Sequence, residues 1–225
     1  MTPLERLQEA AAAAADLGLV DHARHAGELA ERSGRRLGFP GEVYVLALVG
    51  GTGVGKSSIL NALAGEDVSP ARALRPTTEK PLAWVASDAR EELRPLLDWL
   101  GVERVVGHDR NDLSRVAILD LPDVDSVRLE HRATVDALLP RIDAVAWVVD
   151  PEKYDDERLH DYLRRLAPHA ERMRFVFNKS DRLDLREQQI LVDDFRQRLA
   201  ADGIEGVPIA MVSAADGSGF EDLRT

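Results

Sequence analysis

A glycine-rich segment at residues 50–57, which reads G-G-T-G-V-G-K-S, sets the narrowest limit on the fold of this chain. It fits the pattern G-x-x-x-x-G-K-[ST] and lies between an apolar run, residues 43–49, and a helix-like stretch, residues 58–64. A strand, this loop and a helix in that order form a phosphate-binding loop, because the helix N-terminus and the inward-turned N–H groups attract phosphate. A glycine-rich turn without a ligand would not need these flanks. The segment therefore predicts a P-loop fold that binds a nucleotide.

Each part of this loop has an expected task. The glycines allow backbone N–H groups to face phosphate oxygens, and Lys56 places a positive charge on the β- and γ-phosphates. Ser57 offers a hydroxyl to Mg²⁺. Lys56 is for the same reason a candidate catalytic residue. We expect nucleotide contacts from Gly51, Thr52, Gly53, Val54, Gly55, Lys56, Ser57 and Ser58.

From residue 42 onward, apolar segments alternate with amphipathic ones, which predicts an α/β fold with a doubly wound, mostly parallel sheet flanked by helices. The six expected strands are residues 42–49, 82–86, 116–119, 144–149, 174–177 and 207–211. The expected helices are residues 56–64, 91–100, 126–139, 157–167 and 185–200. We interpret the helix at 91–100 and a short strand near 104–106 as an insertion.

Two further segments indicate which base is bound. Residues 178–181 read N-K-S-D directly after an expected strand and match N-K-x-D. A carboxylate that accepts from both N–H groups of guanine finds no match in adenine, so Asp181 should select guanine. Residues 213–219 read S-A-A-D-G-S-G after the last expected strand, and the Ala214 N–H is expected to meet the guanine carbonyl. The expected base contacts are Asn178, Lys179, Asp181, Ser213 and Ala214.

The magnesium site is expected from three segments. Asp120 ends the strand at 116–119 and begins D-L-P-D, where a D-x-P-G element would place the carboxylate that holds Mg²⁺ through a water. Asp123 stands in place of the glycine. Residues 75–78 read R-P-T-T, and we choose Thr78, with Thr77 as the alternative, to close onto Mg²⁺ and the γ-phosphate. The expected metal ligands are Ser57, Thr78 and Asp120, and Thr78 joins Lys56 as a candidate catalytic residue.

Together these motifs resemble GTPases of the translation-factor-related (TRAFAC) class, in its Era-like and dynamin-like branch. Residues 61–66, 75–78 and 150–154 are similar to a group of poorly characterised actinobacterial GTPases. The resemblance covers residue 42 to the end. It implies a GTPase domain at residues 41–225, GTP and GDP as ligands, and Mg²⁺ as cofactor.

The resemblance also bears on the ends of the chain. Residues 4–36 are rich in Ala, Glu and Arg and are broken near Gly18, so we expect a two-helix extension within residues 1–40. This extension could bind a partner, complete a larger helical bundle, or pack as a flap. In the similar group a helical, sometimes membrane-associated region follows the GTPase domain. The last expected helix has about one turn here, so we expect it to be truncated and any membrane association to depend on a missing C-terminal region.

The residues that accelerate hydrolysis in similar GTPases are replaced. Ras-like enzymes position water with a Gln where this chain has Val124. Potassium-activated relatives use an Asn, and dynamin-like ones a Gln and a Ser, where this chain has Thr52 and Gly53. We therefore expect a slow intrinsic rate, accelerated by a homodimer or a protein partner.

Charge and composition exclude other classes. The net charge of −11 opposes a broad nucleic-acid footprint, although a local basic patch remains open. The absence of cysteine excludes disulfides and thiol chemistry. No apolar stretch approaches the roughly 18 residues that span a bilayer.

We expect a soluble, cytoplasmic GTP-dependent switch that hydrolyses GTP slowly. The alternatives are a nucleotide-dependent assembly module with negligible hydrolysis unless dimerised, and an ATPase or nucleotide kinase, which would need an arginine-rich lid.

Overall fold

The computed structural model describes residues 3–36, 43–69, 80–123, 142–221 and 223. The helix expected at residues 126–139 lies outside these residues, as do Thr77, Thr78 and Val124.

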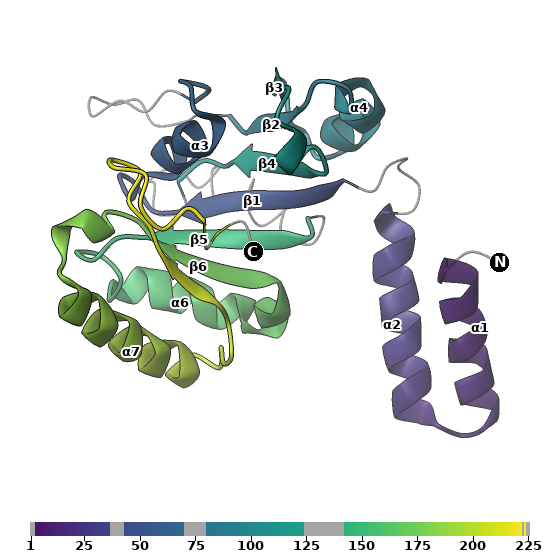
Figure 1. The fold of residues 1–225 in the computed structure, drawn as a ribbon. Helices are drawn as coiled ribbons and strands as arrows, with labels where there is room; N and C mark the ends of the chain where they lie inside the picture. Colours follow the sequence, from purple (N-terminus) through teal and green to yellow (C-terminus); the bar gives the residue numbers. More distant parts are fainter. Residues whose placement is uncertain (1–2, 37–42, 70–79, 124–141, 222, 224–225) are drawn as a thin grey trace.

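A seven-stranded sheet forms the centre of the part of the chain that begins at residue 43, in the order β3-β2-β4-β1-β5-β6-β7 (Figure 1). Only β2 and β4 pair antiparallel, and every other neighbouring pair is parallel. The strands are β1 (Tyr44–Gly50), β2 (Leu82–Ala86), β3 (Arg104–His108), β4 (Val116–Asp120), β5 (Ala144–Val149), β6 (Met173–Phe177) and β7 (Ile209–Met211). The six expected strands are all present. The segment interpreted as part of an insertion is a seventh strand, β3, which extends the sheet beside β2.

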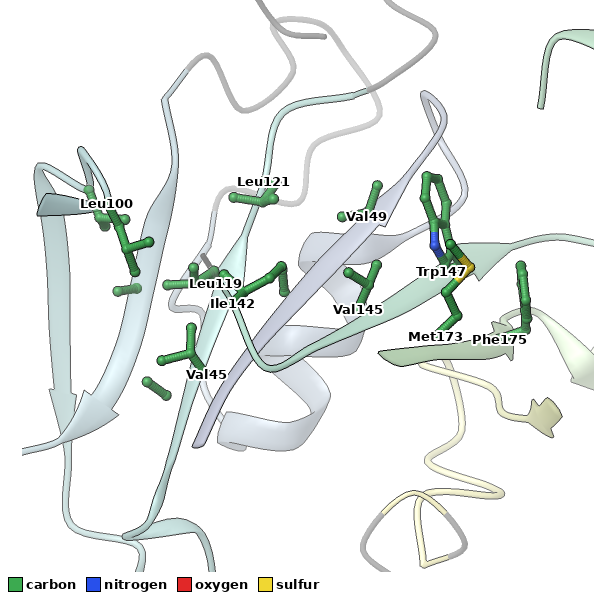
Figure 2. Packing of buried hydrophobic residues seen from close by; sticks show 14 of the residues in the cluster. Val45, Val49, Leu100, Leu119, Leu121, Ile142, Val145, Trp147, Met173 and Phe175 are labelled. Carbon is green, nitrogen blue, oxygen red and sulfur yellow. The ribbon is translucent and has the colours of Figure 1, made fainter. Parts of the chain in front are cut away.

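Helices cover both faces of this sheet, because each central strand is apolar on both sides. On one face, α3 (Lys56–Ala64) packs Ile59, Leu60 and Leu63 against Leu48 and Val148. The other face carries the larger hydrophobic cluster, part of which is shown in Figure 2. Its helices are α4 (Arg90–Trp99), α6 (Glu157–Leu166) and α7 (Leu185–Ala201). Short 3-10 helices are η1 (Asn111–Leu113), η3 (Ala167–Arg172) and η4 (Ser180–Arg182).

Two further helices, α1 (Pro3–Asp16) and α2 (Val20–Arg36), pack against each other as a hairpin before the sheet (Figure 1). The turn between them places Gly18 at a φ of 71°, which favours a residue without a Cβ. The described helices include none whose length and apolar character would let it cross a membrane.

The parallel order gathers the chemically informative loops at one edge. In the register of β1 with β4 and β5, Leu48 pairs with both Asp120 and Ala146, so the carboxyl ends of these strands lie together. The loop after β1 is the glycine-rich segment, and the loop after β6 begins with Asn178. In open α/β sheets, ligands bind at this edge.

Candidate functional site

The glycine-rich loop joins β1 to α3 and is shaped by contacts that only glycine allows. Gly55 is the N-cap of α3 with a φ of 98°. A Cβ on Gly55 would lie 2.1 Å from Nδ2 of Asn178, and one on Gly50 would lie 2.3 Å from the carbonyl oxygen of Val148. Both distances are shorter than real carbon contacts. The loop can therefore approach β5 and the 178–181 segment only with glycine at these positions.

Lys56 folds back over this loop and is buried, with 5% of its surface exposed. Its ammonium group donates to the carbonyl oxygens of Gly50, at 3.0 Å, and Gly51, at 3.2 Å. It also forms a buried ion pair with Oδ1 of Asp123. The lysine expected to hold phosphates thus has three acceptors from the chain itself.

Ser57 and Asp120 meet beside this lysine. The Ser57 hydroxyl donates to Oδ2 of Asp120 at 2.7 Å, and the Ser69 hydroxyl donates to the same oxygen at 2.6 Å. Asp120 is fully buried, and its Oδ1 has no hydrogen-bond partner in the described part of the chain. Burial raises the pKa of Asp120, while hydrogen bonds from Ser69 and Ser57 and the charge of Lys56 act in the opposite direction.

This arrangement fits a magnesium ion. A buried carboxylate with an unpaired oxygen is stabilised by a cation, and Mg²⁺ prefers oxygen ligands such as the Ser57 hydroxyl and the Asp120 carboxylate. The described residues contain no cluster of three or more acidic or histidine side chains that could enclose a metal by themselves. Mg²⁺ in phosphate sites is typically completed by phosphates and waters. The third expected ligand, Thr78, falls outside the described residues.

On the opposite side of the loop, Asn178 connects two segments that are distant in sequence. Its Nδ2 donates to the carbonyl oxygen of Val54 at 2.9 Å, and its Oδ1 accepts from the N–H of Ala214 at 3.0 Å. Only 3% of Asn178 is exposed. The Ala214 N–H, which we expected to meet guanine, therefore already has a partner, and a bound base would share it.

Lys179 and Asp181 complete this side. Lys179 adopts a φ of 64°, the single positive value at a non-glycine residue in the described ranges. Its ammonium donates to the carbonyl oxygen of Gly53 at 2.9 Å and pairs with Oδ2 of Asp150 at 2.8 Å. Asp181, in η4, is exposed and forms no hydrogen bond or ion pair with other described residues. Its carboxylate is thus available to a ligand.

Ser213 stabilises the 213–219 loop by hydrogen bonds. It is fully buried, and its hydroxyl accepts from the N–H groups of Ala215, at 3.2 Å, and Asp216, at 3.4 Å. Its own N–H donates to the carbonyl oxygen of Ser218 at 3.0 Å. These bonds hold the 213–219 loop in shape, which places Ala214 beside Asn178.

Four site residues were missing from the sequence expectations: Asn61, Ser69, Asp150 and Lys153. The Asn61 side chain binds both N–H and carbonyl of Ser69, at 2.8 Å each, and so directs Ser69 toward Asp120. Lys153 donates to the carbonyl oxygen of Thr52 at 2.7 Å. Asp150 follows a fully buried strand, and Asn61, Asp150 and Lys153 lie in the segments 61–66 and 150–154 that resemble known GTPases, so the strand position and this resemblance were the available signals.

A protein-family model described as 50S ribosome-binding GTPase matches residues 45–179, more than half of the chain. The matched range begins in β1 and contains the glycine-rich loop, Asp120 and Asn178.

Two curated proteins are similar in sequence. The uncharacterized protein YkfA of Escherichia coli (strain K12) is 31% identical over 147 residues, which cover 62% of this chain and 42% of YkfA. GTPase Era of Erythrobacter litoralis (strain HTCC2594) is 25% identical over 184 residues, which cover 80% of this chain and 53% of that protein. The chain thus spans about half the length of these relatives.

A solved structure has a similar fold. It is an oligomerised bacterial dynamin pair, described as a mechanism for long-range sensing and tethering of membranes. The TM-score is 0.60 at 14% identity, over 96% of this chain and 38% of that chain. At this identity the likeness concerns the fold alone.

Proposed function

Because the chain belongs to the 50S ribosome-binding GTPase family, we propose that it binds GTP with Mg²⁺, hydrolyses it slowly to GDP and phosphate, and acts as a nucleotide-dependent switch. Membership of this family, with the similarity to Era, confirms the expected Era-like GTPase class, and the bacterial dynamin shares the fold. The slow rate of hydrolysis, the binding of Mg²⁺ and the role as a nucleotide-dependent switch are parts of the proposal.

One observation carries the guanine assignment. The Asn178 side chain joins the glycine-rich loop, through Val54, to the 213–219 loop, through Ala214. Lys179 adds a second bond to the glycine-rich loop at Gly53. This bracing presents the exposed Asp181 carboxylate from the segment that already contacts the phosphate loop. A carboxylate there accepts from the two guanine N–H groups, whereas adenine presents one acceptor nitrogen and a C–H group at these positions.

The chemistry of the proposed reaction divides among few residues. Lys56 neutralises phosphate charge, and the loop N–H groups and the α3 N-terminus bind the remaining phosphate oxygens. Ser57 and Asp120 would hold the ion, which supplies positive charge between the β- and γ-phosphates when bound. Thr52 and Gly53 offer neither an amide nor a long polar side chain to the γ-phosphate, which supports a slow intrinsic rate.

The second candidate is a nucleotide-dependent assembly module whose hydrolysis is negligible until two copies or a partner meet. The extent of the likeness to the oligomerised bacterial dynamin pair, 96% of this chain, favours it. In this case the group that activates hydrolysis comes from outside the chain, as arginine fingers do in some GTPases.

Titration calorimetry with GTP, GDP and ATP in the presence of Mg²⁺ tests the binding proposal. We expect GTP to bind at least about 100-fold more tightly than ATP, because a mispaired carboxylate is costly. Equal affinity for the two nucleotides would refute the guanine assignment.

Phosphate release measured over a range of protein concentrations separates the two candidate functions. A hydrolysis rate per molecule that rises with concentration indicates activation by assembly, and a constant slow rate indicates a monomeric switch. A fast rate in dilute protein without potassium ions contradicts both.

A further inference from the structure

The ammonium group of Lys56 has no free N–H in this structure. A lysine donates three hydrogen bonds, and Lys56 uses them on the carbonyl oxygens of Gly50 and Gly51 and on Oδ1 of Asp123. The Lys56 and Asp123 side chains are 5% and 8% exposed, so water does not easily compete. A phosphate oxygen can reach this ammonium only if one of the three acceptors leaves.

Charge decides which acceptor leaves. The two carbonyl oxygens are neutral and belong to the loop that holds the nucleotide, whereas Asp123 is an anion on the lysine. An arriving phosphate would place a second anion against the same ammonium, and like charges at such short range repel strongly. The carboxylate of Asp123 is therefore the group that a nucleotide displaces.

The position of Asp123 makes this displacement feasible. Its Oδ2 is buried and has no hydrogen-bond partner among the described residues, so only one of its two oxygens is stabilised. Asp120 lies three residues before it and adds a like charge to the same pocket. When Asp123 turns toward water, both of its oxygens gain hydrogen bonds, which offsets part of the lost ion pair.

We propose that the Asp123 carboxylate occupies Lys56 in place of a nucleotide phosphate and thereby lowers the preference of this protein for GTP over GDP. This inference rests on the proposed function. GDP and GTP both displace the carboxylate, but GTP brings an additional phosphate charge to the end of the pocket where Lys56 and Asp123 meet. A displaced carboxylate remains tethered close by, so it repels GTP more than GDP. Asp123 is thus a specificity-determining residue.

The test compares Asp123→Asn with the wild-type chain by titration calorimetry, using GTP and GDP with Mg²⁺. Asparagine keeps the shape and removes the charge. We expect the ratio of the GDP dissociation constant to the GTP dissociation constant to rise about tenfold, a change of about 1.4 kcal/mol. The matched control is Glu205→Gln, which removes one negative charge from an exposed residue after α7 and should leave the ratio unchanged within about twofold.

The outcomes separate the inference from the function on which it rests. If wild-type protein prefers GTP to ATP but the ratio in Asp123→Asn equals that of the wild type, the inference is overturned and the proposed function stands. If wild-type protein shows no guanine preference, both are overturned. Should Asp123→Asn fail to fold without nucleotide, Asp123→Gly is purified with GDP and the ratio is measured by competition. A raised ratio supports the inference, and an unchanged one overturns it.

Discussion

The two halves of the candidate site are built from different interactions. On the base side, Asn178, Lys179 and Ser213 have hydrogen bonds to backbone groups or to a paired carboxylate. On the phosphate side, two buried carboxylate oxygens, Oδ1 of Asp120 and Oδ2 of Asp123, lack partners among the described residues. Among the described residues, the buried side chains Asn178 and Ser213 on the base side thus have partners without a ligand, whereas two buried carboxylate oxygens on the phosphate side do not.

This difference indicates where the binding free energy is gained. Hydrogen bonds that are already formed without a ligand reduce the conformational entropy lost on binding, so the base side should contribute mainly selectivity. Buried charges without partners are costly, so the phosphate side gains stability when a cation and phosphates arrive. Ligand affinity should therefore depend more on the phosphate side, and ligand choice more on the base side.

The largest expected effect is that of Lys56→Ala on affinity. Removal of this ammonium takes away the charge for the phosphates and leaves Asp123 buried without a cation, so GTP and GDP should both bind about 1,000-fold more weakly. Titration calorimetry measures the loss. Lys80→Ala serves as the control, because it removes the same charge from an exposed pair with Glu103. Affinity within tenfold of the wild type in Lys56→Ala would mean that the phosphate side is not the main source of binding.

The base side should respond in selectivity. Asp181→Asn replaces an acceptor by a donor, so GTP should bind about 100-fold more weakly while xanthosine triphosphate gains affinity. Competition between the two nucleotides measures the change. Asp193→Asn makes the same chemical change on the exposed face of α7 and should alter neither. A parallel loss for both nucleotides in Asp181→Asn would indicate a damaged fold rather than altered base recognition.

The contact between the two halves can be tested with two glycines that flank α3. In Gly55→Ala the new Cβ would meet the Asn178 amide, and the free energy of unfolding should fall by about 3 kcal/mol. In Gly65→Ala the backbone is also left-handed but nothing lies within 4 Å, so backbone strain alone should cost about 1 kcal/mol. Urea denaturation compares them. Equal losses would show that the Asn178 contact is not important for stability.

The smallest expected effect is a gain in stability. Burial raises the pKa of Asp120 above its ordinary 3.8, so the folded protein binds this proton more tightly than the unfolded chain does. Stability therefore falls as pH rises from about 3.8 through the raised pKa, and the full cost is present above that pKa. Asp120→Asn should remove this pH dependence and stabilise the nucleotide-free protein at pH values where the wild-type carboxylate is charged. Thermal unfolding of both proteins between pH 4 and 7 measures the difference. A variant less stable than the wild type at pH 7 would contradict the view that burial without a cation destabilises the charged carboxylate.

The sequence was sufficient for the parts of the molecule that depend on local patterns. The apolar runs predicted the strands, and the glycine spacing predicted the loop between β1 and α3, because each is set by neighbouring residues. The contacts of Ser69 and Asp123 could not be predicted in this way. They join residues 51 and 67 positions apart, and such pairs are determined by the order of strands in the sheet. The pairing of β3 with β2 depends on the same strand order, which the short apolar run of β3 does not reveal.

The two hydrogen bonds of the Asn178 amide have a consequence for how base preference can change over time. Any substitution of Asn178 disturbs the phosphate loop and the 213–219 loop together. A substitution there that changed the base preference would therefore also lower the affinity for every nucleotide. Asp181, three residues later, is exposed and forms no such hydrogen bonds with the described residues. A change of base preference should therefore arise by substitution at position 181. Position 178 is constrained by its two structural hydrogen bonds rather than by base recognition.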